Sequence, residues 1–298
     1  MGDLSAFKIA EFLAAPFAAS LILTGIHAYL GVHVVERGVI FVDLSLAQIA
    51  ALGATIAILM PFSDGDPHSR SVYWVSLAFT FIGAAIFSFV RTKQARIPQE
   101  AIIGITYAVA SAAAILAMSK STSQAEHLKD MLVGNIIAVS WHDVFKTAGL
   151  YGAVGLFHYV YRKPFLAISM SHEHAEASGL NVRLWDFLFY ASFGFVVTSS
   201  VSIAGVLLVF CYLIVPSVAA MLYAESIGRR LAIGWTMGTI VSALGVYLSL
   251  VLDLPTGATI VCTFGLVLML MAAARPLIKR PKHSLEEVSE AERPGPSV

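Results

Sequence analysis

Four side chains that could bind a divalent cation lie in a mostly apolar part of the chain. His27 and His33 are six residues apart, and Asp43 and Gln48 follow them. An unpaired polar group is costly inside a bilayer, so each is a candidate for lining a transport pathway. The two whose side chains are candidate metal ligands are His27 and Gln48, although an amide binds zinc weakly. For the histidines and the glutamine the structural alternative is hydrogen bonding between helices. For the aspartate it is contact with solvent or with Arg37.

Known catalytic motifs are missing from the sequence. The segment His172-Glu173-His174-Ala175-Glu176 begins like a zinc-protease helix, but it lacks the second histidine that H-E-x-x-H requires, and two histidines alone complete no metal site. There is no Gly-Lys dipeptide, hence no G-x-x-x-x-G-K phosphate loop, and no G-x-S-x-G elbow. We therefore expect a transport subunit rather than an enzyme, with no cofactor of its own. If ATP drives transport, a separate chain hydrolyses it.

Membrane-spanning helices are the elements predicted to position these residues. Of 298 residues, 58% are apolar and only 13% charged, against roughly 25% charged in soluble domains. Crossing the hydrocarbon core as a helix takes roughly 20 residues. Nine stretches fit, and they comprise residues 12–35, 44–63, 71–90, 101–119, about 144–161, the two halves of 187–224, 231–252 and 254–274. We place a turn near residues 202–205, and the weakest span is 144–161, because Lys146 lies near its end.

The distribution of positive charge predicts an orientation. With nine spans and the N-terminus outside, 14 of the 19 basic residues fall on the inner side and 5 on the outer side, as the positive-inside rule requires. The formal net charge is zero, so nucleic acid is not an expected partner. We predict an all-α polytopic helical bundle over residues 1–278, surrounded by lipid. Residues 279–298 are expected to form a disordered cytoplasmic tail, because they hold too little apolar surface to fold alone.

A polar segment between the fifth and sixth spans is predicted to form a short helix at the inner membrane surface. Ser171 is a candidate N-cap, acidic residues follow in the first turn, and Gly179 stands at a plausible end. An ordinary amphipathic connector is the alternative interpretation.

Several segments, in the right order, resemble one known family. In the C-terminal half these are "EHAEASGLNVRLWD", "SIAGVLLVFCYLIVPSVAAML" and "GVYLSLVLDLPTGATIV"; in the N-terminal half it is "GVHVVERGVIFVDLSLAQIAALGATIA". They are similar to the permease subunits of ATP-binding cassette (ABC) importers for zinc, manganese and iron. The resemblance extends from about residue 10 to residue 275.

The resemblance implies a permease like those of type II ABC importers, pairing as a homodimer in the bacterial cytoplasmic membrane and moving a divalent metal ion by alternating access. Its implied partners are cytoplasmic ABC ATPase subunits, which bind the ATP, and an extracytoplasmic metal-binding solute-binding protein. Residues from about 172 to 181 would be the coupling helix. Its ATPase-contacting residues are predicted to be His174, Glu176, Ala177 and Gly179.

Two features of the spans bear on the pathway. The family places an Asp and a His four residues apart in the second span, where this chain has Leu44 and Gln48; Asp43 is one residue too early, about 100° around a helix. Pro216 would kink the seventh span and is a candidate gating residue, although prolines are common in spanning helices.

The alternative function is an ion-coupled secondary transporter of a small solute. That class needs acidic residues central in the spans, and the predicted spans contain none.

Overall fold

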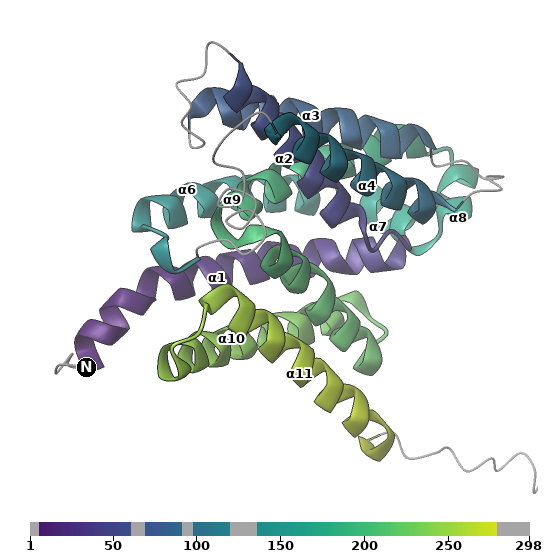
Figure 1. Cartoon of the computed structure of the whole chain (residues 1–298). Coiled ribbons are helices and arrows are strands. Elements are labelled where there is room, and N and C mark those ends of the chain that lie inside the picture. Colours follow the sequence, from purple (N-terminus) through teal and green to yellow (C-terminus); the bar gives the residue numbers. More distant parts are fainter. Residues whose placement is uncertain (1–5, 61–68, 91–97, 120–135, 279–298) are drawn as a thin grey trace, which may run out of the picture.

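The computed structural model describes residues 6–60, 69–90, 98–119 and 136–278 (Figure 1). Throughout these ranges the regular structure is helical and no strand occurs, which confirms the predicted all-α bundle. The expected tail at 279–298 lies outside the described residues.

The helices follow one another with short connections. Their bounds are α1 Ala6–Glu36, α2 Val42–Leu59, α3 Arg70–Val90, α4 Gln99–Met118, the 3₁₀ turn η1 Ile136–Ala138, α6 Trp141–Val160, α7 Arg162–Met170, α8 His172–Ala177, α9 Val182–Tyr223, α10 Ile227–Leu252 and α11 Thr256–Ile278. Seven of the described helices are long and apolar enough to cross a membrane. They are α1, α2, α3, α4, α9, α10 and α11.

The break in α9 accounts for one further span. Gly205 interrupts the helix with φ 74° and ψ 161°, a backbone conformation that is essentially restricted to glycine. It divides α9 into residues 182–204 and 206–223, which confirms the turn expected near residues 202–205. The remaining predicted span corresponds to α6, which has 20 residues but is less apolar than the others. Each of the nine predicted stretches therefore coincides with a helix or half-helix of the described structure.

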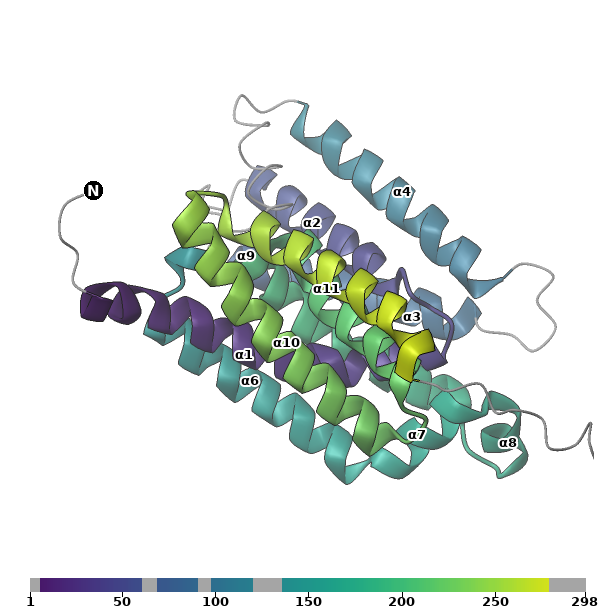
Figure 2. The same cartoon turned by 90° about the horizontal axis from the view of Figure 1, so that it is seen from below.

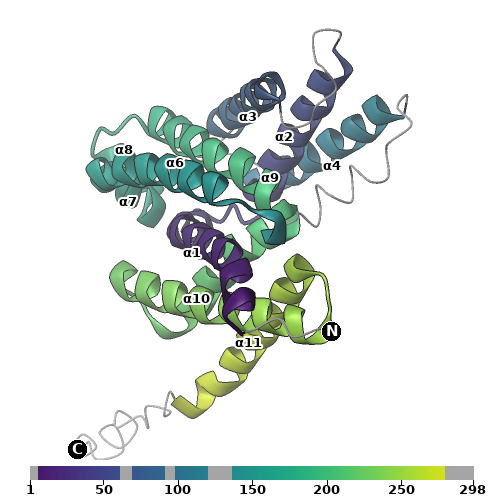
Figure 3. The ribbon, with the colours of Figure 1, turned by 90° about the vertical axis from the view of Figure 1, so that its left-hand side faces the viewer.

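Helix α9 forms the centre of the bundle, with α1 packed along it. Figure 3 shows α2, α3 and α4 on one side of this pair and α10 and α11 on the other. In the most apolar stretch of α9, 72% of the residues are buried, against 22% in the corresponding stretch of α4 and 28% in that of α11. Since the outer helices are as apolar as the centre, their exposed side chains suit a lipid surrounding rather than water.

Candidate functional site

The two positions at which the resemblance implies metal ligands, Leu44 and Gln48, fall on one face of α2. Leu44, Gln48 and Leu52 are four residues apart, so they share a face of the helix. Leu44 and Leu52 are partly exposed, and Gln48 is 7% exposed. At the beginning of the same helix, Phe41 stacks on Phe210 of α9 with ring centroids 6.5 Å apart. Along Leu44, Gln48 and Leu52 this face therefore offers one amide group, where the resemblance implies an Asp and a His.

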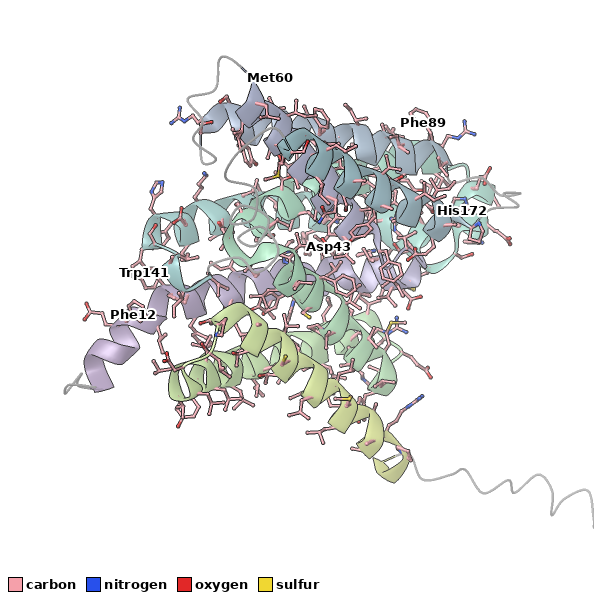
Figure 4. All side chains as sticks on the ribbon, in the orientation of Figure 1. Phe12, Asp43, Met60, Phe89, Trp141 and His172 are labelled. Atoms are coloured by element: carbon pink, nitrogen blue, oxygen red, sulfur yellow. The ribbon has the colours of Figure 1, made fainter. Side chains whose placement is uncertain are left out.

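The Asp43 carboxylate points into the bundle instead. The residue is 1% exposed, and neither carboxylate oxygen has a hydrogen-bond partner among the described residues. Figure 4 shows Asp43 in the interior, between the end marked by Trp141 and the end marked by His172. The structure therefore shows neither the solvated nor the Arg37-paired arrangement that the sequence left open, because the guanidinium of Arg37 is bound to Asp186.

His27 links three helices through hydrogen bonds. Its Nδ1 donates to the carbonyl of Leu23 at 2.8 Å, and its Nε2 lies 3.1 Å from the hydroxyl of Ser200 in α9. The same hydroxyl lies 2.5 Å from that of Tyr151 in α6. Both ring nitrogens are thus in use, which is the helix-to-helix bonding named above as the structural alternative. His27 could ligate a metal through Nε2 only after giving up its bond to Ser200.

His33 connects α1 to the surface helix α7. Its Nδ1 lies 2.8 Å from the hydroxyl of Ser169, while the Nε2 has no partner within the described part of the chain. The Nε of Arg37 donates to the same hydroxyl at 2.9 Å. Arg37 also contacts the Asp186 carboxylate at 2.5 Å and lies over the ring of Phe189 at 4.0 Å. This cluster joins the end of α1 to α7 and to the start of α9.

A third group of hydrogen bonds, around His158, lies between the groups around His27 and His33. This histidine is not among the candidates singled out from the sequence. His158 of α6 contacts the Tyr29 hydroxyl at 3.3 Å and the Ser192 hydroxyl at 2.8 Å, and it is 1% exposed. The rule that singled out His27 also applies to His158, because both are histidines within predicted spans. No comparable signal marks Tyr151 or Asp186 as partners, since their contacts join residues far apart in the sequence.

The structure does not assemble a metal site from the predicted ligands of one chain. Within the described ranges, no three His, Cys, Asp or Glu side chains lie close enough to hold a metal ion. No hydrogen bond to the Gln48 side chain occurs there either, and the Nε2 of His27 is bonded to Ser200 of α9. The metal assignment of His27 and Gln48 stays a prediction.

The predicted short helix is present as α8. The Ser171 hydroxyl caps it by accepting the N–H of His174 at 3.3 Å, as predicted. The helix covers 172–177 rather than about 172–181, because Gly179 adopts φ 80° and turns the chain back. Ala175 is buried against Ile168 and Val182. The predicted ATPase-contacting residues, all exposed on the other side of α8 or in the turn after it, are His174, Glu176, Ala177 and Gly179.

Pro216 is buried within the second half of α9, close to α10. The break in the helix lies at Gly205, and the backbone angles around Pro216 stay helical. Next to the proline, the Ser217 hydroxyl donates to the Leu213 carbonyl at 2.8 Å and to the Ala28 carbonyl of α1 at 3.3 Å. The backbone at Pro216 therefore shows no break, and the gating role of Pro216 stays a prediction for mutagenesis to test.

A bundle of apolar helices with a polar network inside and a short exposed helix between its spans defines a multi-pass membrane protein. The family described as the ABC 3 transport family matches residues 9–275. The chain belongs to this family.

Individual relatives agree with this assignment. The manganese import system permease protein ScaB of Streptococcus parasanguinis is 26% identical, and the match covers 79% of this chain and 88% of ScaB. The chelated iron transport system membrane protein YfeC of Yersinia pestis is 25% identical, covering 89% of this chain and 85% of YfeC. The fold is similar to that of a chain in the structure of PsaBC from Streptococcus pneumoniae in complex with Fab. There the TM-score is 0.73 at 22% identity, and the match covers 93% of this chain and 95% of that one.

Proposed function

We propose that this chain is the permease subunit of an ABC importer that carries a divalent metal ion across the cytoplasmic membrane by alternating access. The observation that carries the proposal is the family match over residues 9–275, together with relatives named for manganese and iron transport. Among the candidate metals we place manganese and iron ahead of zinc, since an amide oxygen at Gln48 suits zinc poorly.

The proposed complex contains a second copy of the permease, two cytoplasmic ATPase subunits that bind the ATP, and an extracytoplasmic solute-binding protein. Helix α8 is the proposed docking element for the ATPase. In support, its capped and packed inner side fixes its position, whereas His174 and Glu176 remain exposed. The N-terminus is proposed to lie outside and the C-terminus in the cytoplasm, on the evidence of the basic residues.

The proposed pathway runs along the Leu44 and Gln48 face of α2. Gln48 is the polar contact for the ion there, and Asp43 is a buried carboxylate one helix face away. His27 and His33 contribute in this proposal if their bonds to Ser200 and Ser169 open during the transport cycle. Without such opening, both histidines hold the helices together.

Uptake of radioactive manganese, iron and zinc tests the function. The permease is expressed with its ATPase and solute-binding subunits in cells that lack other importers for these metals, and Gln48→Ala, His27→Ala and the control Ile240→Ala are compared. Ile240 is 59% exposed on α10, which lies on the opposite side of α1 and α9 from α2 (Figure 3). We expect ATP-dependent uptake of one metal, a loss of about tenfold or more in Gln48→Ala, and nearly normal uptake in the control.

Three results contradict parts of this proposal. Uptake that persists in ATP-depleted vesicles would favour an ion-coupled secondary transporter. Unchanged uptake of every metal in both the Gln48 and His27 variants would show that the pathway residues are wrong. A complete absence of metal uptake, with the complex assembled, would move the substrate to another class.

A further inference from the structure

A polar pocket and an apolar groove adjoin one another where α9 ends, α10 begins and α11 ends. The pocket encloses about 630 Å³ and the groove about 570 Å³. Figure 2 shows this end of the bundle on the same side of the molecule as α7 and α8. Tyr223 lines both spaces, so the groove and the pocket adjoin at this residue.

Two arginines from different helices give the pocket its charge. Arg229 lies in the first turn of α10, and Arg275 lies in the last turn of α11. The Nε of Arg275 is buried and has no hydrogen-bond partner among the described residues. Arg230 is already committed to Glu36 and to the Ala224 carbonyl. With Glu225 as the acidic residue of the lining, the pocket keeps an excess of positive charge that suits a phosphate group.

The groove is apolar and follows the helices into the membrane. Its lining from α11 comes from successive turns of the helix and comprises Val267, then Leu270 and Met271, then Ala274. Ile233 of α10 lines the groove as well. The eight residues from 267 to 274 extend for about 10 Å of helix. The Tyr223 hydroxyl donates to the Met271 carbonyl, which fixes the ring at the junction of groove and pocket. A slot of this composition next to lipid suits a hydrocarbon chain.

We propose that this composite site binds an anionic glycerophospholipid, with its phosphate between Arg229 and Arg275 and one acyl chain in the groove. Basic pockets between spans on the cytoplasmic side of a membrane are suited to anionic headgroups. A free phosphate ion would fill the pocket alone, whereas a phospholipid uses both spaces. This inference depends on the proposed function in one respect. The proposed orientation of the chain, with its C-terminus in the cytoplasm, makes the cytoplasmic leaflet the source of the lipid.

Native mass spectrometry of the full-length chain in detergent tests the headgroup. The protein is titrated with dioleoyl phosphatidylglycerol and, separately, with dioleoyl phosphatidylcholine. We expect tighter binding of phosphatidylglycerol, weakened about fivefold by Arg229→Gln and again by Arg275→Gln, with phosphatidylcholine unaffected. The matched control is Arg183→Gln, an exposed arginine at the same end of the bundle that lines neither space.

A second variant tests the groove and leaves both arginines in place. Ala274→Phe fills the slot, so it should weaken binding of dioleoyl phosphatidylglycerol but not of the dihexanoyl form, whose short chains need little of the groove. Because it keeps the pocket, this variant decides the matter even if the arginine variants fail to fold.

Several outcomes overturn the proposal. They are equal binding of the two lipids, arginine variants that behave like Arg183→Gln, and unaltered long-chain binding in Ala274→Phe. Full displacement of the lipid by millimolar inorganic phosphate would assign the pocket to free phosphate. The experiment uses neither metal nor ATPase, so its failure is distinguishable from failure of the transport function.

Discussion

Several polar side chains of α1 have hydrogen-bond partners on three other helices. His27 is bonded to Ser200, and Tyr29 to His158. Nearer the end of the helix, Arg37 contacts both Ser169 and Asp186. Because an unsatisfied buried polar group costs more than its bond contributes, these contacts fix the position of α1 against α6, α7 and α9.

Breaking the Arg37–Asp186 pair should destabilise the fold strongly. Both side chains are at most 1% exposed, so Asp186→Ala leaves the guanidinium buried without its carboxylate. We expect a loss of about 3–5 kcal/mol, measured as a lowered thermal unfolding midpoint of the detergent-purified protein. The double variant Arg37→Met with Asp186→Leu should be more stable than Asp186→Ala alone, because it removes both charges.

The neighbouring pair of Glu36 and Arg230 supplies the control. Its side chains are 21% and 13% exposed, so water partly screens both charges and Glu36→Ala should cost less than Asp186→Ala. An Asp186→Ala protein as stable as the Glu36→Ala protein would show that the buried pair does not hold α1 in place.

Candidate residues could be found from the sequence, but their partners could not. A histidine in an apolar run is visible without a structure, and the hydrogen-bonding alternative for His27 follows from the cost of burying it. The identity of Ser200 as that partner is not visible, because it lies 173 residues away. The same limit applies to Asp43: its two structural alternatives, contact with solvent and pairing with Arg37, both differ from the structure, while its pathway role stays a prediction.

At the scale of elements, apolar length and charge spacing are sufficient to locate the membrane-spanning helices, but they do not predict α7, which covers Arg162–Met170. The turn inside the long run 187–224 followed from the bilayer thickness, and Gly205 supplies it. The extent of α8 was overestimated, because the positive φ of Gly179 ends the helix earlier than the polar pattern suggests. The distance between two packed helices depends on the side chains that each presents to the other. A single sequence does not show which residues of two helices face each other.

Two glycines of α1 should respond differently to alanine. A Cβ at Gly31 would lie 1.9 Å from the Leu213 carbonyl oxygen, so α1 and α9 would have to separate; at Gly25 a Cβ meets nothing within 4 Å. We expect Gly31→Ala to destabilise the protein by about 1–3 kcal/mol or more. Gly25→Ala should be neutral or stabilising by up to about 1 kcal/mol.

Thermal unfolding of both variants in one detergent, followed by circular dichroism, measures this difference. Equal unfolding midpoints would mean that α1 and α9 are not in close backbone contact in the membrane protein.

At the scale of the whole molecule, the zero net charge conceals an uneven distribution. The end that carries α7 and α8 also carries the Arg37–Asp186 and Glu36–Arg230 pairs, along with Arg229 and Arg275. Concentration of arginine at one end is what the positive-inside rule associates with the cytoplasm. The proposed ATPase contact and the proposed lipid site therefore lie on one face of the membrane.

Cysteine labelling of intact cells tests this orientation through α6, the least apolar of the nine predicted spans. Cys211 and Cys262 are first replaced by alanine, and then His142→Cys or Ser178→Cys is introduced. Both positions are exposed; residue 142 lies in the first turn of α6, and residue 178 lies beyond its other end, after α8. An impermeant maleimide should label the cysteine at 142 from outside, and the cysteine at 178 only after permeabilisation. Labelling of both from outside would mean that α6 does not cross the membrane. The reverse pattern would place α8 outside the cell, where no ATPase could reach it, and would remove the proposed coupling role together with the orientation.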